Sequence, residues 1–516
     1  MSQTQDSVRQ DKAFDELTNA ILERDQPRTA DTFFRMVARE GRSVPQAVAV
    51  AMAAEAPFVQ VPNHINVKDG QITLINNDHT ILGIRTSSAL APWLPKEYQL
   101  LPMLQSIWYI PAGLDIWNQL LGKYPGRYAT MKGINVPPPD YGPVVWNQDQ
   151  APIREGKTIE ERLHNHMIAT MVGDVTRSYG MFLDLAADPD ARAQLRDQML
   201  FLGLIDMQDT IVGRKARNTG HKALRARAIT DLADFVGWDN AHGVFYTGVP
   251  DMAVGPLYYS TYDSVCVYLT EAFPDGGKSL PQTNRTPLTP AEVEAFVHLL
   301  MTGESRAVWD QLTAHLQAGK SVRSLGDTIQ IGAAENILRN TVPRKFTDGQ
   351  HSFDYCNTAN YWLRTSDNPY RARILYLMAH FVNDVAQANQ YHTSVIEQEI
   401  AGYNDGNRTP DTLLRDLDEA ILSFDVARTA GVADAYLRSG ADRKDYMSAV
   451  AVTACKFQDD PHNQKITHST FEEYQNNTTH LKDRLLMATV RQLAGWPKMP
   501  GGRDCYARFM SDWIKH

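Results

Sequence analysis

Apolar residues recur at helical spacing along most of the chain, in stretches that end at glycine, proline or a capping residue. The clearest stretch, LTNAILERD at residues 17–25, returns 400 residues later as LDEAILSFD at residues 417–425. A glycine, Gly41 or Gly440, follows each copy and is itself followed by a stretch rich in alanine and valine. The pattern predicts the same pair of amphipathic helices at both ends of the chain, with fainter copies centred on two further glycines. These are Gly220 and Gly319.

A histidine follows the repeat glycines at a recurring distance. It comes 23 residues after Gly41, 22 after Gly220 and 22 after Gly440. These histidines are His64, His242 and His462. The copy around Gly319 departs from the spacing and first meets His351, 32 residues on. A repeated unit that delivers a histidine to an equivalent place predicts one imidazole-lined cavity, although ordinary helix packing explains the leucine and alanine seams equally well.

The predicted fold class is all-α, with duplicated helix pairs in two lobes around a central cavity. Capping boxes beginning at Thr158 and Thr289 mark the starts of two helices. Residues 65–75, INVKDGQITLI, alternate apolar and polar positions around Asp69-Gly70, which predicts a small β-hairpin near the N-terminus. Two proline-rich stretches divide the chain into an N-terminal lobe with the hairpin, a middle segment and a C-terminal lobe. The segments are 1–150, 151–290 and 291–516.

Composition narrows the class of protein. The chain of 516 residues is long enough for a large interior and a buried pocket. Its charge of −9 is spread rather than clustered, which argues against a nucleic-acid partner. The one basic stretch, residues 214–227, has helical spacing and is interpreted as a solvated face rather than an anion site. With no signal-peptide pattern and no long apolar run, we expect a cytoplasmic protein without membrane contact.

Several common catalytic motifs are missing. The chain contains no GxGxxG, GxxxxGK[ST], HExxH, GxSxG or CxxCH. A Rossmann cofactor site, a P-loop, a zincin, a serine-hydrolase elbow and a c-type haem are therefore unsupported. The four cysteines lie far apart, so a disulfide framework or an iron–sulfur cluster lacks its spacing as well.

Two segments in the first lobe could bind a ligand. Asn77 and His79 lie in NNDHT at residues 76–80, where asparagine and aspartate are ordinary turn formers but a turn does not require the histidine. Residues 108–128, which include Trp117, concentrate aromatic and polar side chains that suit a flat organic molecule. Core packing would explain these aromatics equally well.

Two helical pairs could hold a metal ion. Glu161 and His164 form one ExxH pair, but a di-iron bundle needs a second pair that the sequence lacks. His380 and Asp384 share a helix face at i, i+4 and could join a mononuclear site such as an iron centre. The alternative is a core histidine hydrogen-bonded to a carboxylate, which would also suit acid–base chemistry.

The histidines at positions 164 and 166 should differ in role. Two residues apart on a helix, they project about 200° from one another and cannot both face one pocket. We expect His164 to face the site, because Glu161 can orient its ring and Ile168 continues that face inward. His166 should form a hydrogen bond within the packing.

Three short segments carry a family resemblance. LHNHM at 163–167 resembles the HNH-type helix of questin oxidase-like proteins, and GPLYYSTYD at 255–263 falls where that family has HPLIHLGY. GQHSFDYCNTANYWLR at 349–364 is similar to its FHxVTxxHALR. The resemblance spans roughly residues 150–390 and implies a helical oxygenase that uses NADPH and O₂ to open a polycyclic quinone by Baeyer–Villiger-type insertion. His164, His166 and His351 match family histidines, whereas Leu257, Tyr258 and Asn360 replace others.

The sequence thus predicts an oxidoreductase of oxygenase type that acts on a hydrophobic aromatic or polyketide-like molecule in a histidine-lined cavity. The catalytic candidates are His79, His164, His351, Tyr355 and His380. The substrate-binding candidates are Asn77, Trp117, Tyr258 and Asn360, and the metal candidates are Glu161, His164, His380 and Asp384. The cofactor stays open between NADPH with O₂ and a metal ion such as iron. The alternative function is a non-catalytic helical-repeat scaffold that binds a protein on its concave face.

Overall fold

The fold is all-α, as the helical spacing predicts. The computed structural model describes residues 12–63, 73–76, 79–114, 150–206, 220–253, 261–342, 346–404, 406–457, 461–496 and 502–514. Within these ranges two short strands interrupt the helices. They are β1 (Gln60–Asn63) and β2 (Thr73–Asn76), which pair antiparallel with Gln60 opposite Asn76 and lie against the helix α12 (His242–Met252).

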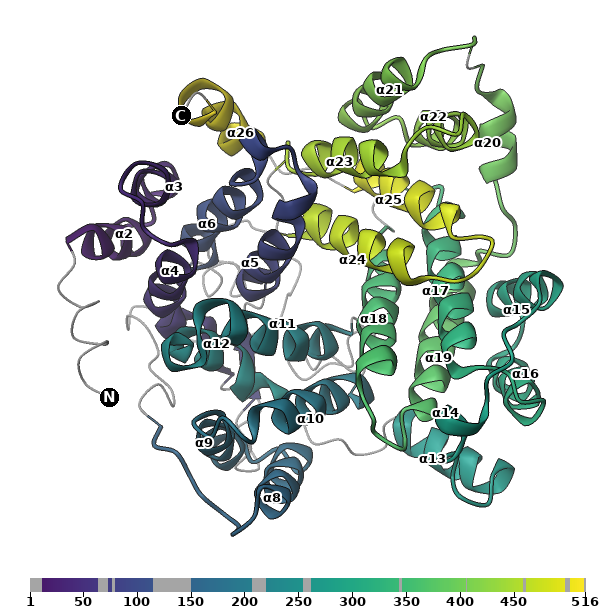
Figure 1. Ribbon diagram of the computed structural model, residues 1–516, viewed down its shortest axis with the longest axis horizontal. Coiled ribbons are helices and arrows are strands. Elements are labelled where there is room, and N and C mark those ends of the chain that lie inside the picture. Colours follow the sequence, from purple (N-terminus) through teal and green to yellow (C-terminus); the bar gives the residue numbers. More distant parts are fainter. Residues whose placement is uncertain are drawn as a thin grey trace.

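The described helices form four successive units with the same order (Figure 1). Each unit has a hairpin of two outer helices, then a connecting, an inner and a returning helix. The first unit comprises α2 (Lys12–Leu22), α3 (Gln26–Phe34), α4 (Val44–Val59), α5 (His79–Leu90) and α6 (Leu101–Gly113). The second comprises α8 (Ile159–Met171), α9 (Val175–Ala186), α10 (Arg192–Ile205), α11 (His221–Val236) and α12 (His242–Met252). The third comprises α15 (Pro290–Thr302), α16 (Ser305–Gln317), α17 (Val322–Leu338), α18 (Phe346–Thr365) and α19 (Ala372–Asn389).

The fourth unit and the shorter connecting helices complete the chain. That unit comprises α21 (Pro410–Leu422), α22 (Val426–Arg438), α23 (Arg443–Ala454), α24 (His462–Asn476) and α25 (Asp483–Gly495). Between or after units lie α13 (Thr261–Ala272), α14 (Leu280–Thr283), α20 (Ile396–Gly402) and α26 (Asp504–Arg508). None of the helices in the described ranges is long and apolar enough to cross a membrane.

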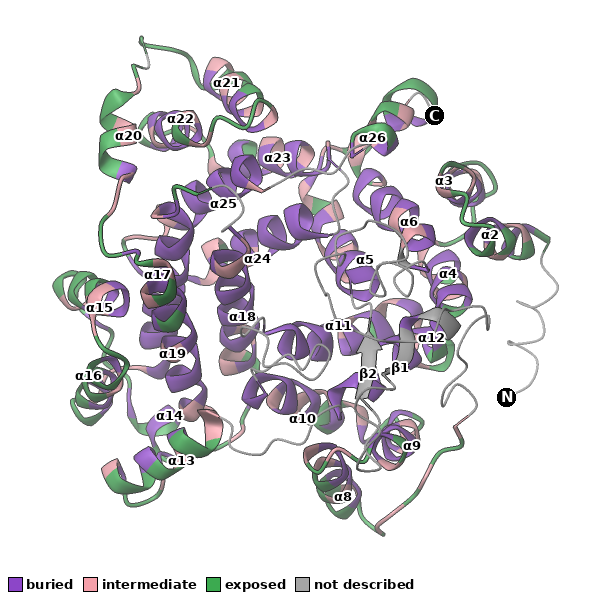
Figure 2. Cartoon of the chain, turned by 180° about the vertical axis from the view of Figure 1, so that it is seen from behind, coloured by how far each residue is buried: buried purple, intermediate pink, exposed green. Residues whose placement is uncertain are grey.

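The four inner helices close into a ring. α5 packs against α11, α11 against α18, α18 against α24, and α24 again against α5. Figure 1 places these four around the centre and the outer hairpins at the periphery. Figure 2 shows the inner helices buried along almost their whole length, whereas the outer hairpins are exposed on one side. Because the inner helices are buried along most of their length, most of the polar residues they carry are enclosed in the protein.

The repeated sequence at the two ends of the chain forms the same turn. Arg24 and Phe424 each follow an outer helix with φ 61°. The next residue, Asp25 or Asp425, caps the following helix by accepting a hydrogen bond from the amide three residues on. The second unit uses Gly173, with φ 79°, and then a capping aspartate in the same way. A single residue with positive φ, a glycine in the second unit, therefore lets each of these hairpins reverse direction.

The copy predicted around Gly220 is wrong. Gly220 is the N-terminal cap of α11, so it precedes an inner helix instead of separating a hairpin from its connecting helix. The equivalent of Gly41, Gly319 and Gly440 in the second unit is the segment between α9 and α10, which contains no glycine. The distance from a glycine does not locate the second unit, because the segments that connect the helices differ in length from unit to unit.

Two other expectations need comment. The ring has four units instead of two lobes, and the segment 291–516 holds the third and the fourth of them. The predicted turn at Asp69-Gly70 lies outside the described residues and stays a prediction; β1 lies earlier in the chain than the predicted range 65–75. The capping boxes at Thr158 and Thr289 are confirmed, with reciprocal hydrogen bonds to Glu161 and Glu292.

The end of the chain is attached to its beginning. The Arg508 Nε donates to Asp31 Oδ1 at 2.7 Å, and the Trp513 indole donates to the same oxygen at 3.2 Å. The Trp513 ring also stacks on Phe34, with centroids 5.6 Å apart. These contacts hold the C-terminal helices on the first outer hairpin.

The buried leucines of the first and last outer hairpins should contribute equally to the stability of the protein. Leu17 is fully buried and Leu417 is 2% exposed. We expect Leu17→Ala and Leu417→Ala each to lower the free energy of unfolding by about 2–5 kcal/mol in urea denaturation. Leu22→Ala is the control in the same helix, since Leu22 is 38% exposed and should change stability by less than about 0.5 kcal/mol. Equal losses at Leu17 and Leu22 would contradict the assigned seam.

Candidate functional site

Four buried histidines meet where the inner helices begin, and we call them the histidine cluster. His79, His221 and His462 are the first residues of α5, α11 and α24, and His351 lies in the second turn of α18. Their rings form a closed circuit in the order of the helices. Centroid separations are 5.6 Å for His79–His221, 4.8 Å for His221–His351, 5.9 Å for His351–His462 and 5.3 Å for His462–His79. All four side chains are buried.

The cluster favours neutral imidazole at His351. Burial, followed by the charges of His221, Lys465 and the other cluster histidines, lowers the pKa of His351 well below its usual range. The Nε2 atoms of His221 and His351 lie 3.0 Å apart, so one nitrogen donates the proton that the other accepts. A neutral imidazole in a hydrogen-bonded pair can take up a proton and pass it to its partner.

A polar shell supports the cluster from α18, α24 and α25. The Gln350 amide donates to the carbonyl of His462 at 2.8 Å and to Asp354 Oδ2 at 3.3 Å. Lys465 lies one turn beyond His462 with its Nζ 3.6 Å from the same Asp354 oxygen. Burial raises the pKa of Asp354 in spite of that lysine. On the other side the Trp496 ring stacks on His462, with centroids 4.3 Å apart.

A small pocket adjoins the cluster at His79, between α5, α6 and α24. Its lining consists of His79, Thr80, Gly83, Gln105, Ser106, Tyr109, Pro461 and Gln464. The Gln464 and Gln105 side chains are joined at 3.0 Å, so the amides are held in fixed orientations. Gly83 keeps the pocket open, because a Cβ there would lie 3.1 Å from Ser106 Oγ and 3.2 Å from Pro461 Cβ. Polar groups around a small opening can orient the oxygen atoms of a ligand.

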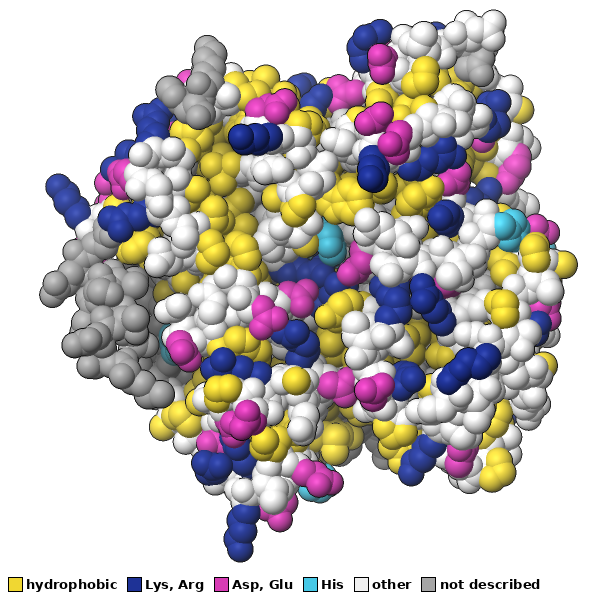
Figure 3. Space-filling model, viewed as in Figure 1, with side chains coloured by type: hydrophobic (Ala, Val, Ile, Leu, Met, Phe, Trp, Pro, Cys, Tyr) yellow, Lys and Arg dark blue, Asp and Glu magenta, His cyan; other side chains and the backbone are white. Residues whose placement is uncertain are grey.

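A second polar layer lies six residues along each inner helix from the cluster. Its members are Arg85, Arg227, Asn357 and His468. The Arg85 guanidinium contacts His468 Nδ1 at 3.2 Å, and Arg227 donates to Asn357 Oδ1 at 3.3 Å. Six residues of α-helix advance about 9 Å, so this layer is clearly separate from the histidines. On the face drawn in Figure 3, basic, acidic and histidine side chains gather where the four inner helices meet in Figure 1.

Acidic side chains complete this charged layer. Glu472 accepts two hydrogen bonds from Arg227, at 2.8 and 2.6 Å, and one from the Asn357 amide at 2.7 Å. Asp231 joins Arg85 at 3.1 Å, so every neighbouring pair of inner helices is bridged. Although burial opposes ionisation, the charge and hydrogen bonds of Arg227 hold the pKa of Glu472 well below its usual range. Burial also lowers the pKa of His468 to about 3.

The basic stretch at 214–227 is not a solvated face in its described part. His221, Lys222, Arg225 and Arg227 are all buried. Lys222 forms an ion pair with Asp206, and Arg225 forms one with Asp251. The interpretation failed because α11 is an inner helix, enclosed on all sides, whose charges need partners within the protein. Residues 214–217 lie outside the described ranges.

The structure brings together three of the histidines that the sequence singled out, of which His462 alone follows the repeat spacing. His79, His351 and His462 share the cluster, as expected of a common cavity. The sequence analysis missed His221 and chose His242, which is exposed at the start of α12. The signal that could have found it is local, because His221 opens a helix directly after a glycine cap. His64 lies outside the described residues.

The assignment of His164 to the site is contradicted. His164 is exposed, and Ile168, expected to continue its face inward, is 40% exposed. Glu161 is occupied by the capping box, where backbone amides of Lys157 and Thr158 lower its pKa. His166 is the buried member: its Nδ1 lies 2.7 Å from the Gln198 amide, and burial lowers its pKa to about 4. The face was misjudged because α8 is an outer helix.

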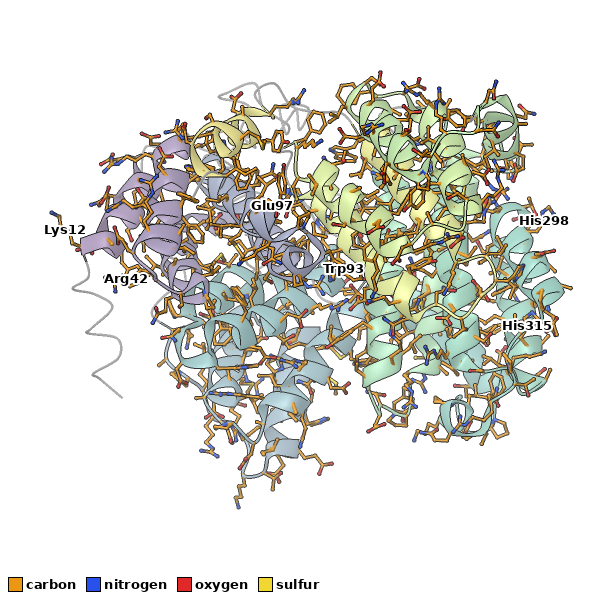
Figure 4. The ribbon with its side chains drawn as sticks, turned by 45° about the horizontal axis from the view of Figure 1, so that its top comes forward. Lys12, Arg42, Trp93, Glu97, His298 and His315 are labelled. Carbon is orange, nitrogen blue, oxygen red and sulfur yellow. The ribbon has the colours of Figure 1, made fainter. Side chains whose placement is uncertain are left out.

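His380 and Asp384 also lie away from the cluster. His380 is half-buried on α19 beside Trp309, with burial lowering its pKa, and Asp384 is exposed. Figure 4 shows two further histidines, His298 and His315, on the outer hairpin of the same unit. The described residues include no group of three or more His, Cys, Asp or Glu side chains placed to hold a metal ion. Within the described ranges, neither the Glu161–His164 pair nor the His380–Asp384 pair is therefore joined by a third such side chain.

Of the remaining candidates, two take part in packing and three lie outside the described residues. The Tyr355 hydroxyl donates to the carbonyl of Leu204 at 2.7 Å, which ties α18 to α10, and burial holds the pKa of that hydroxyl well above its usual range. The Asn360 amide donates to Gly326 O at 3.3 Å and to Glu473 Oε2 at 3.1 Å. Both side chains stabilise the fold. Asn77, Trp117 and Tyr258 lie outside the described residues.

No family model, curated protein or solved structure matches the chain. The resemblance to questin oxidase-like proteins therefore depends on short motifs alone. Of the motif histidines, His351 belongs to the cluster, whereas His164 and His166 lie on the outer helix α8. The chemistry of the cluster and its pocket is the firmer ground for a functional conclusion.

Proposed function

We propose that the protein is an oxidoreductase that binds a small hydroxylated aromatic molecule beside the histidine cluster. The observation that carries this proposal is the convergence of four buried imidazoles, one from each unit, next to a polar pocket. Burying ionisable groups opposes folding. The burial of four of them at one place therefore supports a functional role for the cluster.

The cluster suits proton abstraction from a phenolic hydroxyl. His79 lines the pocket and would meet the hydroxyl, and behind it the neutral His351 can share the proton with His221 through the 3.0 Å contact between the Nε2 atoms. The Gln105 and Gln464 amides would orient oxygen atoms of the ligand. An ionised hydroxyarene is electron-rich, which is the form that reacts most readily with an oxidant. The oxidative step, with NADPH and O₂ as cosubstrates, rests on the resemblance to questin oxidase-like proteins.

A scaffold function has less support. Repeat proteins that bind partners present an open concave surface, whereas the inner helices here pack against one another in a closed circuit. The polar residues of those helices are buried and face each other. We therefore give the catalytic function precedence.

A hydroxyanthraquinone tests this function directly. We expect 1,8-dihydroxyanthraquinone to bind beside the cluster, which a shift of its visible absorbance measures. Addition of NADPH in air should then consume O₂, followed with an oxygen electrode. Metal analysis of the same sample identifies any bound iron. A dye that remains unbound, or one that is consumed equally fast by His351→Gln, would contradict the proposal.

A further inference from the structure

A buried carboxyl group lies directly behind the pocket. Glu55, on α4, is fully buried. Its Oε1 accepts a hydrogen bond from Thr80 Oγ1 at 2.6 Å, whereas its Oε2 has no hydrogen-bond partner among the residues that the structure describes. Thr80 follows His79 in the first turn of α5 and lines the pocket. The carboxyl group therefore reaches the pocket through a single hydroxyl.

Among the residues that the structure describes, no ion pair explains the burial of Glu55. α4 packs against α2, α6, α11 and α12, together with β1 and the turn Arg35–Arg39, whose Arg35 is paired with Glu16 and Glu40. The charged side chains buried on α11 and α12 are paired elsewhere: Lys222 with Asp206, Arg225 with Asp251, and Arg227 with Glu472. The causes acting on the Glu55 carboxyl are burial, which raises its pKa to about 8, and the opposing hydrogen bond from Thr80. Glu55 therefore holds its proton at neutral pH.

We propose that Glu55 is the proton store of this site and delivers its proton, through the hydroxyl of Thr80, to an oxygen atom of the molecule bound beside His79. The proposal rests on the proposed function, in which the pocket holds the substrate. The acceptor is a carbonyl or similar oxygen that gains negative charge in the reaction, as a quinone carbonyl does. Glu55 is thus a positioning residue that acts through Thr80 and complements the base at His351.

The transfer balances without a further reactant. A rotation of the carboxyl group about its Cγ–Cδ bond turns the acidic proton toward Thr80 Oγ1. The Thr80 O–H bond breaks as its proton moves to the ligand oxygen, and a new O–H bond forms with the proton from Glu55. Glu55 ends as a carboxylate that accepts a hydrogen bond from Thr80, the contact seen at 2.6 Å. Hydroxyl groups between an acid and a substrate relay protons in this way.

Infrared spectroscopy of the ligand-free protein tests the proton store. At about pH 7 the difference spectrum between the wild type and Glu55→Gln should contain the C=O stretch of a carboxylic acid. Thr80→Val should shift that band, because it removes the hydrogen bond to the carbonyl oxygen, and Thr80→Ser should restore it. A spectrum without the band overturns the proposal, and a band that is unchanged in Thr80→Val overturns the relay.

The pH dependence of unfolding supplies a second readout. A proton held up to about pH 8 in the folded protein is lost near pH 4.5 in the unfolded chain. The stability contributed by Glu55 is therefore fully present below about pH 4.5 and is lost as the pH rises through about 8. The unfolding constant of the wild type, relative to Glu55→Gln, should rise about tenfold per pH unit between about pH 5 and 8. A constant ratio overturns the proposal.

The same variants separate this proposal from the proposed function. Binding of 1,8-dihydroxyanthraquinone should shift the Glu55 band in the wild type and leave the Thr80→Val spectrum unchanged. If the dye fails to bind while the band is present, the proposed function fails and the buried acid is retained. If the dye binds and the Glu55 band does not respond, the relay is overturned and the proposed function is retained.

Discussion

Arg227→Met should lower the free energy of unfolding by about 3–5 kcal/mol, because it leaves buried carboxylates without their cation. The Arg227 side chain is 5% exposed and forms two hydrogen bonds to Glu472, at 2.8 and 2.6 Å. Its Nε also lies 3.4 Å from Asp231, and its guanidinium stacks on the Tyr361 ring at 3.8 Å. Chemical denaturation at neutral pH measures the loss.

A double variant and a surface variant serve as controls for this result. Glu472→Gln combined with Arg227→Met should recover part of the stability, since it removes the buried charge that the single variant strands. Arg28→Met should cost less than about 1 kcal/mol, because Arg28 and its partner Glu23 are 41% and 60% exposed. A loss at Arg227 no larger than that at Arg28 would show that the charged layer does not hold the ring together.

His351→Gln should reduce turnover of the hydroxyanthraquinone by about 10²- to 10⁴-fold, the usual contribution of a general base. Glutamine retains a polar group near the position of the imidazole Nε2 but cannot accept a proton at neutral pH. The melting temperature should change little, because the contact with His221 can be kept by the amide. Steady-state kinetics and calorimetry on one preparation measure both quantities.

The control for this variant is His164→Gln. His164 is exposed on α8, away from the cluster, so turnover and melting temperature should both match the wild type. The opposite pattern, with turnover lost at position 164 and kept at position 351, would move the active site to the outer hairpin and exclude the cluster as its catalytic centre.

The repeat was visible in the sequence because it depends on local packing. Leu17 and Leu417 occupy equivalent buried positions in the first and last outer hairpins. In both hairpins the turn that follows needs one residue with positive φ and then a capping aspartate. The second and third units were harder to find, since their connecting segments differ in length and Gly220 stands at a different place in its unit. Helix capping was predictable for the same reason as the hairpins, because both depend on residues three or four apart.

The members of the site were only partly predictable. His462 followed from its distance to a repeat glycine, His79 from its polar segment and His351 from a short motif, whereas His221 was assigned to a solvated basic helix although it directly follows the glycine cap of α11. Glu55 gives no signal in its own segment, which reads as an ordinary alanine-rich helix. Whether a polar residue is enclosed depends on where its helix lies in the ring, and that position follows from packing between units far apart in the chain.

The attachment of the C-terminus to the first outer hairpin has a consequence for how the protein unfolds. A linear array of repeats has two terminal members, each held on one side, and such arrays fray from their ends. Here the first and last units pack against each other through α5 and α24, and Arg508 holds the final helices on Asp31. Every unit is therefore held on both sides, so the array has no terminal unit from which unfolding could begin. Releasing any one unit must break the junctions on both of its sides, which favours a single concerted transition over stepwise loss of units.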